Sequence, residues 1–136
     1  MNQKFEITTL ILRVVLGITF FVHGLDKFQG GIENTAGWFA SIGLPGFLAY
    51  GVAVIELVGG ILLIIGLASR VVSGLLAVVM IGAILKVKIA AGFLGGYELD
   101  LALLAMAAVI AINGSKLLAV DQFLFKGNKN QNDIAA

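Results

Sequence analysis

The fold is decided by the stretch FLAYGVAVIELVGGILLIIGL, residues 47–67, which carries a single charged residue, Glu56, near its middle. A helix of about 20 apolar residues is long enough to cross the roughly 30 Å hydrocarbon core of a bilayer. An acid at the bilayer centre costs at least about 2.5 kcal/mol even on the mildest scales. We therefore expect a transmembrane helix whose carboxyl group faces other helices or a hydrated cavity.

The composition of the whole chain agrees with this stretch. Of 136 residues, 60% are hydrophobic and 12% are charged, and the mean hydropathy is +1.05. In soluble domains about a quarter of all residues are charged, so these values indicate an integral membrane protein. A net charge of +1 offers no basic face for nucleic acid, which we exclude as a partner. With no cysteine and one histidine, His23, the chain carries no recognisable metal-ligand set.

Three further apolar stretches predict three more helices. We expect an all-α integral membrane four-helix bundle with spans at about 7–28, 46–67, 71–90 and 99–120, forming one domain over residues 1–125. Residues 126–136 are polar and are predicted to be a disordered tail. More lysine and arginine residues lie on the side of the two termini, so the positive-inside rule predicts both termini in the cytoplasm.

The interval between the first two spans, residues 29–46, is rich in glycine and holds the only proline. Within it, Trp38 and its apolar neighbours predict a short amphipathic helix at the membrane interface. This helix is interpreted either as an interfacial anchor or as a lid over a pocket near the outer leaflet.

Polar residues within the spans supply the candidate functional groups. At 1.5 Å per residue, Arg13 and Glu56 lie at depths that an arginine side chain can bridge, so one interpretation is an ion pair between them. In the other, Arg13 extends to the cytoplasmic headgroups and Glu56 is protonated and hydrogen-bonded. His23 either relays a proton or is a hydrogen-bonded core group. At about 100° per residue, one stripe of the first helix contains Arg13, Gly17, Phe20, Gly24 and Lys27.

Several short motifs resemble those of the DoxX family. They are Arg13-x-x-x-Gly17, His23-Gly24-x-x-Lys27, Pro45-Gly46, Glu56-Leu57-x-Gly59-Gly60 and Gly96-Tyr97-Glu98. The resemblance covers residues 7–121 and includes small Gram-positive members tied to catechol and quinone stress. It implies a multi-pass protein of the bacterial plasma membrane, with polar landmarks at Arg13, His23, Lys27, Glu56 and Glu98. Lys86 and Lys88 stand where many members carry histidine, so the resemblance lends no metal or haem role.

The main functional hypothesis is a quinone-linked membrane oxidoreductase component in redox or quinone and catechol stress defence. We expect Glu56, Arg13 and His23 to be catalytic, and the substrate to contact Lys27, Phe20, Trp38, Tyr97 and Glu98. No covalently bound cofactor is expected, and a quinone is the candidate ligand. The expected partners are the lipid bilayer, a soluble redox enzyme and a second copy of the chain. The alternatives are a non-enzymatic membrane anchor or scaffold for a soluble enzyme, and a small-molecule permease.

Overall fold

A computed structural model describes residues 3–124, and the tail predicted at 126–136 lies outside the described residues. The described part is helical and contains no strand. Its helices are α1 (Gln3–Gln29), α2 (Ile32–Ser41), α3 (Phe47–Ile65), α4 (Ser69–Ala83) and α5 (Glu98–Asn113). Between α4 and α5 lie a π-helical segment η1 (Ile84–Lys88), a 3-10 turn η2 (Ile89–Ala91) and a kinked turn η3 (Phe93–Tyr97).

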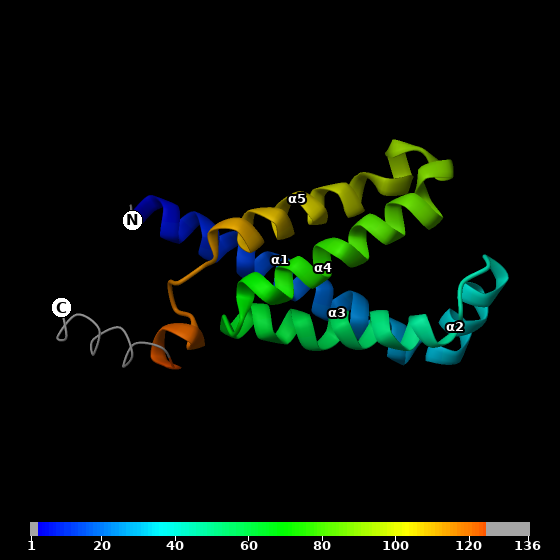
Figure 1. The fold of residues 1–136 in the computed structure, drawn as a ribbon, viewed down its shortest axis with the longest axis horizontal. Coiled ribbons are helices and arrows are strands. Elements are labelled where there is room, and N and C mark those ends of the chain that lie inside the picture. Colours follow the sequence, from blue (N-terminus) through cyan, green and yellow to red (C-terminus); the bar gives the residue numbers. More distant parts are fainter. Residues whose placement is uncertain (1–2, 125–136) are drawn as a thin grey trace.

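Four segments are long and apolar enough to cross a membrane, namely Gln3–Gln29, Phe47–Ile65, Ser69–Ala91 and Phe93–Asn113. The all-α, four-span bundle expected from the sequence is therefore confirmed. The start of α1 and residues 120–124 lie at the same end of the bundle (Figure 1). The cytoplasmic placement of that end stays a prediction.

The bundle consists of two closely packed helix pairs, α1 with α3 and α4 with α5 (Figure 1). In the first pair, glycines set the distance between the backbones of α1 and α3. A Cβ atom added at Gly60 would lie 2.5 Å from the backbone nitrogen of Phe21, and one at Gly24 would lie 2.5 Å from that of Leu57. Small residues allow such backbone contact between transmembrane helices. Helix α1 therefore presents its predicted stripe to α3, with Arg13, Gly17, Phe20 and Gly24 all buried.

A leucine-rich core joins the two pairs in the middle of the bundle. Its fully buried members include Leu16, Leu63, Leu76 and Ala107. Large apolar side chains on the outside of all the helices are exposed, as expected of surfaces that face lipid. The core separates two polar ends, which we name the strap end and the pocket end.

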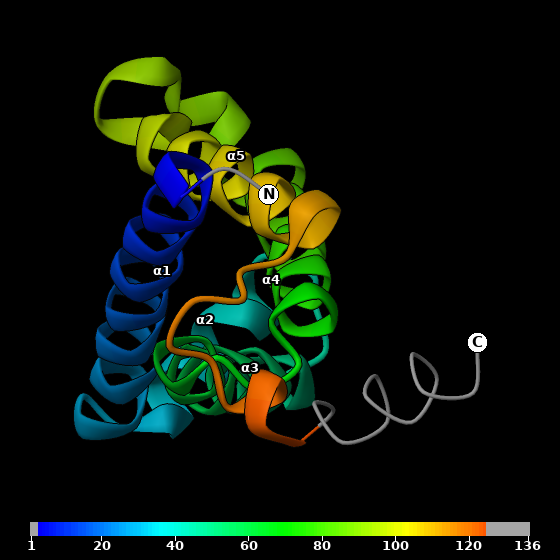
Figure 2. The same cartoon turned by 90° about the vertical axis from the view of Figure 1, so that its left-hand side faces the viewer.

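The strap end is where α1 begins and α3 meets α4. Helix α5 ends at Asn113, before the Val120 expected from hydropathy, because Gly114 adopts a φ of 73°. Residues 114–119, which we call the strap, then cross the end of the bundle (Figure 2). Beyond the strap, the Asp121 carboxylate accepts a hydrogen bond from the backbone nitrogen of Ala68 at 2.8 Å. The chain is thus fixed to the α3–α4 turn.

Arg13 holds the strap from inside, and the predicted Arg13–Glu56 ion pair is wrong. The side chain is 1% exposed, so it does not extend to the headgroups either. Its guanidinium donates hydrogen bonds to the backbone oxygens of Ser115, Leu117 and Leu118 at 3.0–3.3 Å. The packing register of α1 on α3 explains the error, because Arg13 lies beside Gly66. That position is roughly 15 Å along α3 from Glu56.

Candidate functional site

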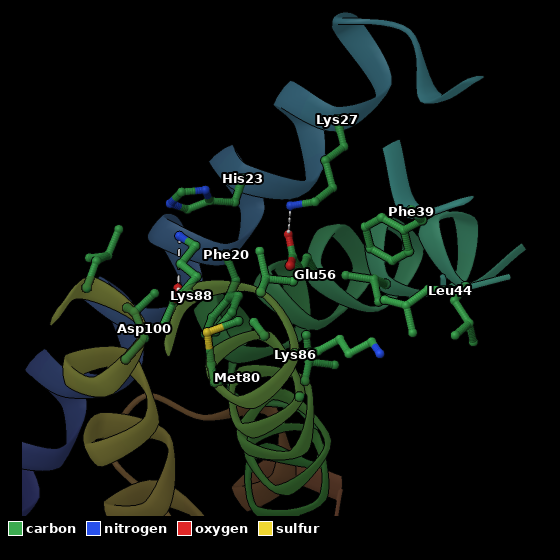
Figure 3. A pocket seen from close by; sticks show the side chains of 18 of the residues that line it. Phe20, His23, Lys27, Phe39, Leu44, Glu56, Met80, Lys86, Lys88 and Asp100 are labelled. Atoms are coloured by element: carbon green, nitrogen blue, oxygen red, sulfur yellow. Dashed lines mark hydrogen bonds and ion pairs between the residues drawn. The ribbon is translucent and has the colours of Figure 1, made fainter. Parts of the chain in front are cut away.

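A pocket of about 450 Å³ opens at the pocket end, between the α1–α3 pair with α2 and the α4–α5 pair with η1 (Figure 3). Most of its wall is apolar. The apolar lining residues are Phe20, Trp38, Phe39, Leu44, Leu48, Val52, Val79, Met80, Gly82, Ala83, Val87, Leu99 and Leu103. The charged or titratable lining residues are His23, Lys27, Glu56, Lys86, Lys88 and Asp100. A largely apolar cavity with a few converging polar groups is typical of small-molecule sites.

Glu56 forms the first of two ion pairs in this pocket. Its carboxylate lies 2.8 Å from the Lys27 ammonium. Glu56 as a whole is 4% exposed, whereas the side chain of Lys27 is 24% exposed. The close approach of α1 and α3 at Gly24 and Gly60 brings the two residues together. Because an ammonium has three N–H donors and only one is used here, Lys27 keeps donors for a ligand.

Lys88 and Asp100 form the second ion pair, at 3.2 Å. Asp100 lies in the first turn of α5 and is buried, while the lysine side chain is 40% exposed. The contact lacks hydrogen-bond geometry, so the Asp100 Oδ2 atom has no hydrogen-bond partner in the described structure. A buried carboxylate oxygen without a hydrogen bond is costly and has free acceptor capacity for a ligand.

The two remaining basic groups of the pocket are more exposed. His23 projects from α1 into the pocket, and Lys86 projects from η1 (Figure 3). No ion pair of Lys86 is found within the described residues 3–124. The pocket can therefore donate hydrogen bonds, accept them and move protons. Among residues 3–124 no three histidine, aspartate or glutamate side chains gather as a metal-ligand set.

The structure brings together five of the eight site residues predicted from the sequence. Phe20, His23, Lys27, Trp38 and Glu56 line the pocket, and Arg13, Tyr97 and Glu98 do not. The Tyr97 ring packs edge-on against Phe93, and the Glu98 carboxylate accepts a hydrogen bond from the backbone nitrogen of Gly95 at 3.3 Å.

Sequence reasoning missed the Lys88–Asp100 pair. The two charges were visible near the same membrane level as His23, but a charge near a helix end is usually interfacial. Asp100 and Glu98 are two residues apart, so on α5 they point about 200° away from each other. Only the packed structure shows that Asp100 faces the pocket.

Comparison with known proteins identifies the family. The DoxX family model matches residues 8–89, which is more than half of the chain. A Bacillus subtilis protein named "Putative oxidoreductase CatD" is 55% identical over 132 residues, covering 97% of this chain and 98% of its own. An uncharacterized protein of Haemophilus influenzae is 32% identical over 85% of this chain and 89% of its own.

A third relative supports the membrane location. It is an uncharacterized membrane protein of Mycobacterium tuberculosis, 35% identical over 65% of this chain and 58% of its own. No solved structure matches the chain. The chain belongs to the DoxX family and is a multi-pass bacterial membrane protein.

Proposed function

We propose that this DoxX-family protein is the quinone-reactive component of a membrane oxidoreductase and acts in defence against quinone and catechol stress. The observation that carries the proposal is the apolar pocket at the pocket end with the Lys27–Glu56 ion pair in its wall. A relative named as an oxidoreductase agrees with this class of activity.

The pocket suits a small quinone in size and in lining. Its volume of about 450 Å³ lies in the range of small-molecule sites, which is about 300–1,000 Å³. Phe20, Trp38 and Phe39 supply aromatic surface for a planar ring. An opening at membrane depth would admit an apolar ligand from the bilayer.

The Lys27–Glu56 pair supplies the acid–base chemistry. Reduction of a quinone to a quinol takes two electrons and two protons, and each carbonyl oxygen becomes a hydroxyl. Lys27 donates a hydrogen bond to one carbonyl oxygen and stabilises the negative charge that develops there. Glu56 holds the lysine in place through the ion pair and accepts a hydrogen bond from the quinol hydroxyl. The electrons come from a two-electron donor, such as a reduced flavin, on a soluble partner enzyme.

The biological role follows from the chemistry of quinones. Quinones are electrophiles that alkylate thiols, and quinols are not. A membrane component that couples a soluble reductant to quinone reduction would lower the quinone concentration in the bilayer, where apolar quinones accumulate.

Trp38 provides a direct test, because it is the only tryptophan in the chain and it lines the pocket. We expect tetramethyl-1,4-benzoquinone, which does not alkylate amines, to quench Trp38 fluorescence saturably in lipid nanodiscs without changing its lifetime. Lys27→Met should weaken quinone binding about tenfold, the usual value of one charge-assisted hydrogen bond. Glu56→Gln should leave quinone binding within about threefold but weaken competition by the quinol about tenfold.

The matched control is Lys116→Met, which removes an exposed lysine that does not line the pocket. It should leave both affinities within about threefold. Unsaturable quenching that is the same in all variants would show that the quinone meets Trp38 only by collision in the bilayer, and the proposal would then be abandoned.

A further inference from the structure

We infer that Lys88 and Asp100 form a second proton-transfer pole of the pocket, opposite Lys27 and Glu56, and that the substrate is therefore a 1,4-quinone rather than a 1,2-quinone. This inference rests on the proposed function, because it assigns the second oxygen of the same ligand. It concerns Asp100, which is not among the polar landmarks of the DoxX resemblance, and Lys88, which stands where many members carry histidine.

The first observation is the position of the two ion pairs. Lys27 and Glu56 come from α1 and α3, and Lys88 and Asp100 come from η1 and α5. These elements form opposite walls of one pocket, and in the view of Figure 3 Phe20 lies between the two pairs. A flat ring seated against Phe20 would thus have one ion pair near each of two opposite edges.

The second observation is the state of Asp100. The residue is 6% exposed, lines the pocket and has an Oδ2 atom without a hydrogen-bond partner in the described structure. An acid that only complemented the positive end of α5 would do so equally well from an exposed position, as Glu98 does on the same turn. This Oδ2 atom lies 3.2 Å from the Lys88 ammonium without forming a hydrogen bond, so it can accept one from a ligand hydroxyl.

The third observation is the local backbone. Segment η1 is π-helical and carries both Lys86 and Lys88, which line the pocket. Such π segments are rare and occur frequently at functional sites.

The two poles together account for both protons of the reaction. Two electrons pass from the partner's two-electron donor, such as a reduced flavin, into the quinone ring. One carbonyl oxygen takes a proton from the Lys27 ammonium and the opposite one takes a proton from the Lys88 ammonium. Both carbonyl double bonds become C–O–H bonds, and the lysines regain protons from water at the pocket opening. A 1,2-quinone has both oxygens on one edge and would reach only one pole.

The test compares two quinones by quenching of Trp38 in nanodiscs. The probes are tetramethyl-1,4-benzoquinone and 3,5-di-tert-butyl-1,2-benzoquinone. The wild type should bind the 1,4-quinone about tenfold more tightly than the 1,2-quinone. Lys88→Met should remove this preference by weakening the 1,4-quinone about tenfold, and Lys88→Arg should restore most of it. The Lys27→Met, Lys88→Met double variant should bind the 1,4-quinone about 100-fold more weakly, because the effects of two independent poles multiply.

The Lys88 variants carry the test, since this side chain is partly exposed and its removal should leave a folded protein. Lys116→Met is the control, because Lys116 is exposed and does not line the pocket, and it should behave as wild type. Asp100→Asn should weaken competition by the 1,4-quinol if it folds. If Lys88→Met matches Lys116→Met while Lys27→Met still weakens quinone binding, the second pole is refuted and the proposed function stands. If the wild type binds neither quinone, both fail.

Discussion

Helix α1 carries an inward-facing cation at each end of the bundle, and the two have different partners. Arg13 at the strap end is enclosed by backbone oxygens of the strap. Lys27 at the pocket end contacts a carboxylate and lines a cavity. The hydrogen bonds of the arginine go to backbone oxygens, which cannot change protonation, whereas the lysine has a titratable partner and spare donors. The comparison teaches that a charge bonded to backbone serves the structure, whereas a charge paired with a carboxylate in a cavity wall is available for chemistry.

The largest effect should come from breaking the strap end. Arg13→Met removes the donors of three strap oxygens, which are buried or partly buried, so we expect a loss of about 3 kcal/mol in the free energy of unfolding. Arg13→Lys should recover only part of this, because an ammonium lacks the guanidinium fork. Unfolding in mixed detergent micelles, followed by circular dichroism, measures both. Stability within about 0.5 kcal/mol of wild type for Arg13→Met would refute a structural role for Arg13.

The next largest effect should come from the helix pair that joins the two ends. An added Cβ at Gly60 would lie 2.6 Å from the backbone oxygen of Gly17, so Gly60→Ala must push α1 from α3. We expect a loss of about 1–3 kcal/mol. Gly51→Ala on the same helix is the control, since nothing lies within 4 Å of its added Cβ. Equal unfolding curves for the two variants would show that backbone contact does not hold the pair.

A smaller effect is expected where the strap joins the α3–α4 turn. Asp121→Ala removes the acceptor of the Ala68 backbone N–H, and Ala68 itself adopts a φ of 51°. The expected loss is about 1 kcal/mol in the free energy of unfolding, and Asp121→Asn should retain most of the stability because its amide oxygen still accepts. If both variants lose equally, charge rather than the hydrogen bond fixes the strap.

The smallest effect on stability should come from the pocket end. Replacing a buried ion pair by apolar residues of similar size is often neutral, so the double variant Lys27→Met, Glu56→Met should unfold within about 1 kcal/mol of wild type. The same variant should lose saturable quenching of Trp38 by the 1,4-quinone. A loss of stability as large as that of Arg13→Met would make Lys27–Glu56 a structural pair and contradict the comparison.

Much of the fold could be predicted because its signals are local. Hydropathy over a span length gives the four transmembrane segments, and a charge within an apolar run marks Glu56 as an inward-facing group. The 3.6-residue period placed Arg13, Gly17, Phe20 and Gly24 on one face of α1, and all are buried. The ends of the helices were harder to predict. For example, α5 ends at Asn113 because of the conformation of Gly114.

The partners of the buried charges were decided by the tertiary structure alone. Partner choice depends on how far one helix slides and rotates against another, which no local pattern contains. The register of α1 on α3 places Lys27 beside Glu56, and Arg13 donates its hydrogen bonds to the strap. The π-helical turn η1 placed Lys88 against Asp100. The sequence by itself thus determined the four spans and the inward face of α1, because these signals are local, and packing determined which charged residues meet around a pocket.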